Sequence, residues 1–122
     1  MIVNADLHIH SRFSMAVSKK MTLPVLSKEA AKKGVSLVGT GDCLHPVWLK
    51  EIKEMQKIDE GTFELNKTRF VLTTEVEDRN RVHHIIFFPS VCSVEEFIEK
   101  IKDKTNLEID GRPKLHLNGE QI

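Results

Sequence analysis

The sequence has no excess of charge of either sign, because its 18 lysine and arginine residues are balanced by 18 aspartate and glutamate residues. No overall basic field therefore draws the chain to nucleic acid or to an anionic membrane, although zero net charge does not exclude a local basic patch. No apolar run approaches the roughly 20 residues that a helix needs to span a bilayer. The first ten residues, MIVNADLHIH, also lack the pattern of a signal peptide. We expect a soluble, cytoplasmic protein.

Cysteine is scarce as well. Cys43 and Cys92 are the only two, and they stand far apart and outside any C-x-x-C pair. This usage predicts free thiols in a reducing compartment. Hydrophobic residues make up 40% and charged residues 30% of the 122 positions, an ordinary globular balance that suits one domain at most.

Hydrophobic periodicity and turn residues predict strands that alternate with helices, which is the pattern of an α/β fold. Strands are expected at Met1–His10, Val35–Asp42, Thr62–Leu65, Arg69–Asp78 and Val82–Phe88. Helices are expected from a Thr22 cap to Lys33, from Pro46 to about Ile58, and from a capping box at Ser93–Glu96 to about Lys104. Closing a barrel of this class usually takes well over 200 residues, so we expect residues 1–122 to be part of a larger fold.

The sharpest motif is Asp6-Leu7-His8-Ile9-His10. Side chains on a strand repeat with a period of two, so His8 and His10 project to the same side and can reach one metal ion. Asp6 lies further back on that side, where it could orient an imidazole. A pair of exposed strand histidines is the alternative.

Other polar groups stand near the ends of later strands. Asp42 and His45 follow a buried strand, at the place where α/β folds put their sites, although Asp42 could equally cap the next helix. Glu75 and Glu77 share one face of their strand, with two solvated glutamates as the alternative.

The pair His83-His84 adds an imidazole to the same set. Adjacent strand residues face opposite sides, so at most one of the two points into a shared site, and periodicity does not choose between them. Together these residues place histidines and carboxylates near the ends of four strands. Such a mixed set suits Zn²⁺, Mn²⁺ or Fe²⁺ better than Ca²⁺, and the sequence therefore predicts a metal site.

The loop after the first motif is basic. Arg12, Lys19 and Lys20 could steer phosphate oxygens, Arg12 through a bidentate contact, while a solvated charged loop is the alternative. Phe13 in this loop is expected to be a buried anchor rather than a platform for a base.

These motifs resemble the polymerase-and-histidinol-phosphatase (PHP) family. The family's first motif, H-x-H, stands here as His8 and His10. Its second motif, usually T-D-H, resembles Thr40-Gly41-Asp42, so that Asp42 occupies the place where most members have histidine. His45, three residues on, could compensate for this change or contact the substrate.

The resemblance also implies roles for later residues. The family's bridging glutamate resembles Glu75, and its next ligand resembles His84 rather than His83. Its later ligands, a further histidine and a D-x-H motif, have no counterpart here, and His116 is not assigned as one. The implied metal ligands are His8, His10, Asp42, Glu75 and His84, with Glu75 and Asp42 also catalytic and Arg12 and His45 binding the substrate.

Within this family the chain is similar to the endonuclease Q branch, in the stretches NADLHIHSRFS, GTGDCLHPVWL, TTEVEDRNRVHHIIFFPS and DGRPKLHLNGEQI. This resemblance implies the N-terminal portion of a distorted (β/α)7 barrel that holds two or three divalent ions (Zn, Mn or Mg). The implied activity is hydrolysis of a DNA phosphodiester 5′ of a deaminated base such as uracil or hypoxanthine, with DNA as the partner of the full-length protein.

Roughly half of such a barrel is present, so the chain alone is expected to be inactive. Two alternatives stay open. One is a PHP phosphatase that acts on a small phosphomonoester. The other is a non-catalytic fragment that keeps a partial metal site.

Overall fold

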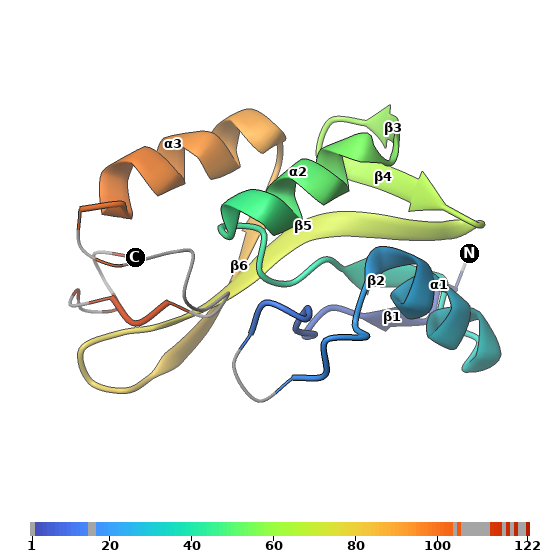
Figure 1. Ribbon diagram of the computed structural model, residues 1–122, viewed down its shortest axis with the longest axis horizontal. Coiled ribbons are helices and arrows are strands. Elements are labelled where there is room, and N and C mark those ends of the chain that lie inside the picture. Colours follow the sequence, from blue (N-terminus) through green and yellow to red (C-terminus); the bar gives the residue numbers. More distant parts are fainter. Residues whose placement is uncertain are drawn as a thin grey trace.

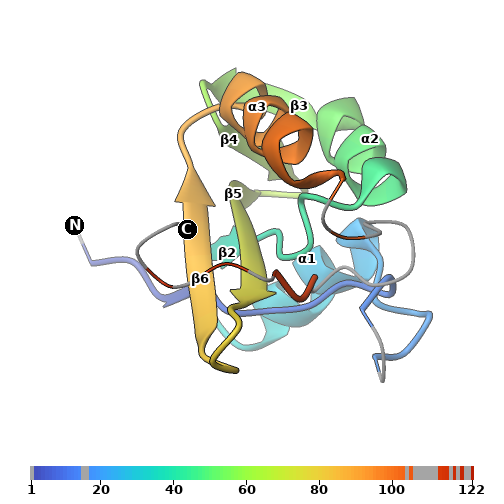
Figure 2. The same cartoon turned by 90° about the vertical axis from the view of Figure 1, so that its left-hand side faces the viewer.

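The computed structural model describes residues 2–14, 17–103, 105, 113–115, 117, 119 and 122. A six-stranded sheet with the order β1-β2-β5-β4-β3 forms its centre, and β6 pairs with β5. The strands are β1 (Ala5–Asp6), β2 (Leu37–Gly39), β3 (Gln56–Asp59), β4 (Thr62–Leu65), β5 (Thr68–Glu77) and β6 (His83–Phe88), and the helices are α1 (Leu23–Lys32), α2 (Pro46–Glu54) and α3 (Val91–Ile101). The two helices α2 and α3 lie on one side of β5, whereas α1 lies beside β1 and β2 (Figures 1 and 2). The expected α/β class is confirmed.

Strands β1, β2 and β5 run parallel, with Ala5 paired to Leu37 and Leu37 paired to Arg69. Strand β5 is much longer than its two parallel neighbours. Its second half continues past them and pairs antiparallel with β6, as Figure 2 shows. The carboxyl ends of β1 and β2 therefore open beside the second half of β5, which is where α/β folds gather polar side chains.

The first strand is shorter than the sequence predicts. Its pairing covers only Ala5–Asp6, because the neighbouring β2 is itself three residues long. His8 and His10 therefore lie in the segment that follows β1, beyond the paired strand.

The second helix ends at Glu54, and the expectation that it continues to about Ile58 was wrong. Residues Gln56–Asp59 form β3 instead, since their backbone pairs antiparallel with β4. The residues Asn66 and Lys67 form the turn between β4 and β5, and both have positive φ angles, of 49° and 69°. Such angles suit a two-residue hairpin.

The third helix also differs from expectation. It begins at Val91 and ends at Ile101, and its N-cap is Ser90 rather than Ser93. The Ser90 hydroxyl accepts a hydrogen bond from the backbone N–H of Ser93 at 3.1 Å. A serine stands at both positions, and the one directly after Pro89 takes the extended backbone of the cap.

Helix α1 follows the prediction closely. It runs from Leu23 to Lys32 behind the N-cap residue Thr22, whose side chain makes no capping hydrogen bond. Gly34 follows its end with a φ of +71°, and the N–H of Val35 donates to the carbonyl of Ala30 at 2.9 Å. This is a glycine-based helix ending.

The core lies between the sheet and the helices. Its largest fully buried side chains are Trp48, Phe70, Leu44, Ile52, Leu72, Ile101, Leu115, Val76 and Val94. Trp48 also ties α2 to the loop after β2, because its indole N–H lies 3.2 Å from the carbonyl oxygen of Thr40 and 2.9 Å from that of Gly41. Cys43 and Cys92 are both free thiols, as expected.

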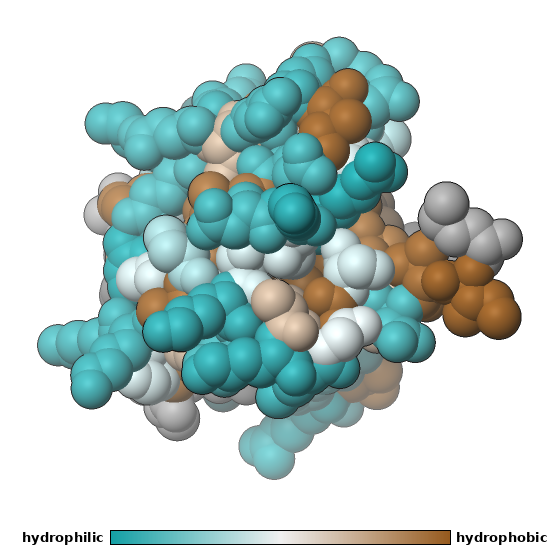
Figure 3. Space-filling model, turned by 90° about the vertical axis from the view of Figure 1, so that its right-hand side faces the viewer, coloured by the Kyte–Doolittle hydropathy of each residue, from teal (hydrophilic) through white to brown (hydrophobic). Residues whose placement is uncertain are grey.

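The surface is mostly polar on the face that Figure 3 shows, where hydrophobic side chains are scattered apart from one protruding group at its edge. The exposed large hydrophobic residues are Ile2, Val3, Val47, Ile58, Val82 and Phe87. Within the described part of the chain, none of the helices has both the length and the apolar character needed to cross a bilayer.

Two glycines with similar backbone angles provide a matched test of the packing beside β2. Gly41 has a φ of +61°, and a Cβ there would lie 2.2 Å from the carbonyl oxygen of Ile9. Gly34 has a φ of +71°, and among the described residues other than its chain neighbours none has an atom within 4 Å of a Cβ placed there. We expect Gly34→Ala to cost about 1–2 kcal/mol through its left-handed backbone alone. Gly41→Ala should cost clearly more in urea unfolding, and equal losses would contradict the close approach of residues 9 and 41.

Candidate metal centre

Two imidazoles and one carboxylate converge beyond the carboxyl end of β1. His8 Nε2 lies 3.2 Å from Glu75 Oε2, and His10 Nε2 lies 2.8 Å from the same oxygen. One ligand atom from each of the three residues lies within 4.8 Å of the other two. The two rings stand nearly perpendicular, at 79°, with centroids 5.3 Å apart. The structure thus brings the two histidines together with a glutamate that lies 67 positions after His8 in the sequence.

These residues fit a divalent cation. Ligand atoms bound about 2.1 Å from one ion lie roughly 3 Å from one another, which is the separation seen between the two imidazole nitrogens and Glu75 Oε2. Two nitrogen atoms and one carboxylate oxygen form a set suited to Zn²⁺, Mn²⁺ or Fe²⁺. The side chains are also graded in exposure, with His8 at 58%, His10 at 19% and Glu75 at 6%, so the group opens to solvent on the His8 side.

Glu75 is the buried member of the group. It lies in the second half of β5, opposite Ile85 of β6. Burial alone would raise the pKa of Glu75, but hydrogen bonds from His83 and His8 outweigh it, and the pKa falls below its ordinary value of 4.5. Glu75 is therefore held as a carboxylate, the form that binds cations.

The two histidines of β6 contact different carboxylates, and the one beside Glu75 is His83 rather than the His84 chosen from the sequence. His83 Nδ1 lies 2.6 Å from Glu75 Oε1, and the register pairs His83 with Glu77 on the same face. His84 pairs with Val76 on the opposite face, and its Nε2 lies 2.9 Å from Asp78 Oδ2. The period of two in β6 separates the two histidines.

Asp42 is fully buried behind His10, and its hydrogen bonds come from a loop. The backbone N–H and the hydroxyl of Ser11 donate to Oδ2 at 2.6 and 2.5 Å, and the hydroxyl of Ser14 lies 2.8 Å from both carboxylate oxygens. Asp42 Oδ1 lies 3.6 Å from His10 Nδ1, which is too long for a hydrogen bond. Asp42 is therefore adjacent to the centre, on the far side of the His10 ring from Glu75.

Asp6 and His45 each accept a hydrogen bond from a nearby backbone N–H. Asp6 accepts a hydrogen bond from the backbone N–H of His8 at 3.3 Å rather than one from an imidazole. His45 is buried at the start of α2, where its Nδ1 accepts from the N–H of Val47 at 3.2 Å. Its ring stacks on Phe13 with centroids 4.0 Å apart, so Phe13 packs against protein.

The basic residues of the loop differ in their surroundings. Arg12 is turned toward α2, where it forms an ion pair with Glu51 through both terminal nitrogens. This pairing raises the pKa of the Arg12 guanidinium. Lys19 and Lys20 are exposed. His116, which the sequence left without a role, lies outside the described residues.

Four partners were not found by sequence reasoning, namely Ser11, Ser14, Glu51 and His83 as a group that contacts Glu75. The S-x-x-S spacing after H-x-H was a visible signal for the serines. Their direction depends on how the loop turns back onto Asp42, and a local pattern does not encode that.

Solved structures of endonuclease Q match almost the whole chain. That of PfuEndoQ, a lesion-specific endonuclease from Pyrococcus furiosus, has a TM-score of 0.95 and 53% sequence identity over 99% of this chain. Endonuclease Q in complex with a 27-mer duplex substrate, with an abasic lesion at its active site, has a TM-score of 0.94 and 54% identity over 99%. This chain spans 31% of each of those chains, so its fold matches that of one part of endonuclease Q.

Two relatives are similar in sequence. An uncharacterized protein of Methanocaldococcus jannaschii is 42% identical in an alignment of 123 residues. This alignment covers 100% of this chain and 14% of that protein. The uncharacterized protein YqxK of Bacillus subtilis is 26% identical over 139 residues, which cover 98% of this chain and 34% of YqxK. No protein-family model matches the chain. The chain therefore spans about a third or less of each protein that it resembles.

Replacing each histidine of β6 separately tests which of them belongs to the centre. His83→Ala should weaken Zn²⁺ or Mn²⁺ binding about tenfold or more, because its ring contacts the Glu75 carboxylate. His84→Ala, a control with the same chemistry one residue away, should leave metal affinity unchanged. Isothermal calorimetry measures both, and the reverse order of effects would support the assignment of His84 that was made from the sequence.

The contact of Glu75 with His83 should make the stability of the metal-free protein depend on pH. The hydrogen bond between His83 and Glu75 raises the pKa of His83 from its ordinary value of 6.5. The pKa of Glu75 is lowered from its ordinary value of 4.5. The stabilisation is therefore complete between these two values. It is lost as the pH falls through the lowered pKa of Glu75 or rises through the raised pKa of His83. The melting temperature of the wild type should exceed that of His83→Gln most near pH 5.5, roughly midway, and a pH-independent difference would refute this.

Proposed function

We propose that the protein is the N-terminal portion of a metal-dependent, endonuclease Q-like DNA repair nuclease. The observation that carries the proposal is the convergence of His8, His10 and Glu75 in a chain whose fold matches endonuclease Q at a TM-score of 0.95 and 53% identity. The three side chains offer a cation site, and the likeness supplies the reaction class. DNA is the proposed substrate, since one of the matching structures is a complex with duplex DNA.

We further propose that segments outside the 31% of endonuclease Q that this chain matches complete the site. A PHP-type barrel with a distorted (β/α)7 arrangement would supply the later ligands, and this chain alone would be inactive. The proposed lesion is a deaminated base, uracil or hypoxanthine, with cleavage on its 5′ side. Because a base within a duplex is hidden in the stack, the target nucleotide would have to be flipped out before it is read.

The chain's own residues would divide the work as follows. His8, His10 and Glu75 would hold one cation, and Glu75 would help to hold a second on the side where its Oε1 lies 2.6 Å from His83 Nδ1. When bound, the cations would lower the pKa of a bound water and neutralise charge on the phosphate oxygens. We assign to Asp42 the task of holding the loop that follows His10, since both of its oxygens accept hydrogen bonds from that loop.

A PHP phosphatase is the second candidate, because it would use the same ligands. The likeness to endonuclease Q at 53–54% identity favours the nuclease.

Substrate choice separates the two candidates. We expect the full-length protein, supplied with Mg²⁺ or Mn²⁺, to cut uracil-containing duplex DNA 5′ of the lesion and to leave histidinol phosphate intact. Gel analysis of end-labelled DNA and a phosphate-release assay measure the two activities. Undamaged DNA of the same sequence is the control. Release of phosphate from histidinol phosphate without DNA cleavage would remove the nuclease proposal.

A further inference from the structure

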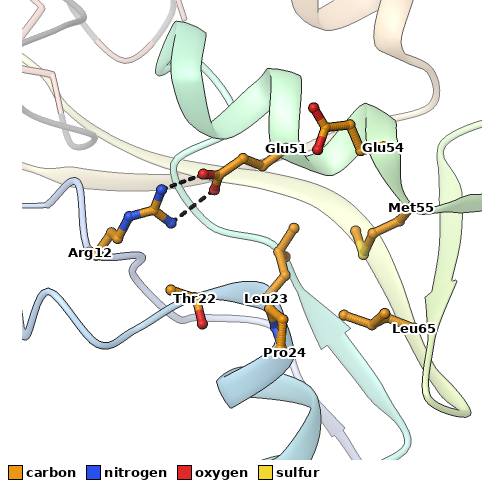
Figure 4. A pocket seen from close by; sticks show the side chains of 8 residues that line it. All are labelled: Arg12, Thr22, Leu23, Pro24, Glu51, Glu54, Met55 and Leu65. Carbon is orange, nitrogen blue, oxygen red and sulfur yellow. Dashed lines mark hydrogen bonds and ion pairs between the residues drawn. The ribbon is translucent and has the colours of Figure 1, made fainter.

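Arg12 occupies an unexpected position for a residue beside a phosphate-processing site. Both of its terminal nitrogens contact the carboxylate of Glu51 on α2, one at 2.8 Å and the other closer. Figure 4 shows the side chain reaching from its loop to the helix, at one side of a cavity of about 370 Å³. The other residues that line this cavity are Thr22, Leu23, Pro24, Glu54, Met55 and Leu65.

The guanidinium is also held by aromatic rings. Its Cζ lies 4.3 Å from the centroid of Phe13 and 5.6 Å from that of Trp48. Phe13 in turn stacks on His45 at 4.0 Å and meets Trp48 edge-on at 6.0 Å. Arg12 and Glu51 are only 23% and 31% exposed, and a bidentate pair of this kind is stronger than a typical surface ion pair.

Arg12 and Phe13 lie between the two serines that hold Asp42. Ser11 precedes them and Ser14 follows them, and both donate hydrogen bonds to the Asp42 carboxylate. Ser11 is also the next residue after His10 in the chain. Whatever fixes Arg12 therefore fixes the backbone on which His10 is presented to Glu75.

We propose that Arg12 is a positioning residue for the metal centre, which locks residues 11–14 onto α2 and so holds His10 and Asp42 in place. This replaces the substrate-binding role that the sequence indicates for Arg12, since a guanidinium with both terminal nitrogens on Glu51 has to break that pair to bind a phosphate. The inference rests on the proposed function, in that His8, His10 and Glu75 are taken to bind a cation. Glu51 acts together with Arg12, because it is the partner on α2 that binds the guanidinium.

The two roles make opposite predictions for Glu51, and a double-mutant cycle in the full-length protein tests them. Positioning predicts that Arg12→Gln and Glu51→Gln each weaken Mn²⁺ binding about tenfold, because residues behind metal ligands tune affinity on this scale. Both should lower kcat on uracil-containing DNA with little change in KM. The double variant should be no worse than either single one, since all three remove the same contact.

Phosphate binding predicts a different pattern, which would overturn the inference. Arg12→Gln would then raise KM for DNA and leave Mn²⁺ affinity unchanged. Glu51→Gln would free the guanidinium and remove a negative charge, so it would bind DNA as well as the wild type or better. Should Arg12→Gln fail to fold, Glu51→Gln alone separates the two roles.

Lys53→Gln is the matched control. It removes an exposed ion pair from the same helix, with Lys53 Nζ 2.9 Å from Glu95 Oε1, and it should change neither metal affinity nor kinetics. A wild-type protein that binds no Mn²⁺ would instead defeat the proposed function itself, and the inference with it. Normal wild-type binding with unaltered Arg12→Gln and Glu51→Gln variants would defeat the inference alone.

Discussion

One buried carboxylate oxygen organises this molecule. Glu75 Oε2 lies 2.8 Å from His10 Nε2 and 3.2 Å from His8 Nε2, and the other oxygen of Glu75 contacts His83. A carboxylate that is only 5% exposed is costly unless positive or hydrogen-bonding groups surround it. Here the groups that compensate for burial are the same ones that suit a divalent cation, so the stability of this region and its proposed chemistry have a common origin.

The sheet makes this convergence possible. Strand β5 extends past β1 and β2, so Glu75 is presented beyond the ends of its parallel neighbours. Gly41 lets the loop after β2 approach the backbone of Ile9 closely, and Asp42 then anchors the segment after His10 through Ser11. The ion pair between Arg12 and Glu51 would attach the same segment to α2. The centre thus depends on contacts between segments that are far apart in the sequence.

Local patterns in the sequence were enough to predict part of this arrangement. The i, i+2 spacing of His8 and His10 and the position of Glu75 on a strand were enough to mark all three as candidate ligands, although both histidines lie beyond the paired part of β1. The pairing of Val76 with His84, which turns His83 toward Glu75, depends on the register of β6 against β5. That register is set by the whole hairpin, which a single strand does not reveal.

Similar reasons explain the other differences. The helix expected to reach Ile58 stops at Glu54 because pairing with β4 competes for residues 56–59. The guanidinium of Arg12 has the chemistry of a phosphate ligand, but it forms an ion pair with Glu51 on α2. Propensity and charge describe what a residue could do, whereas tertiary partners decide what it does. The likeness to endonuclease Q covers all these elements, and this chain spans 31% of that chain.

The sharing of one cation by His8, His10 and Glu75 is tested most directly by anomalous diffraction from crystals soaked in Mn²⁺. The account predicts a difference peak about 2.0–2.3 Å from His8 Nε2, His10 Nε2 and Glu75 Oε2 together. A peak bound by only one of these atoms, or strong peaks at other positions with none between the three side chains, would contradict it.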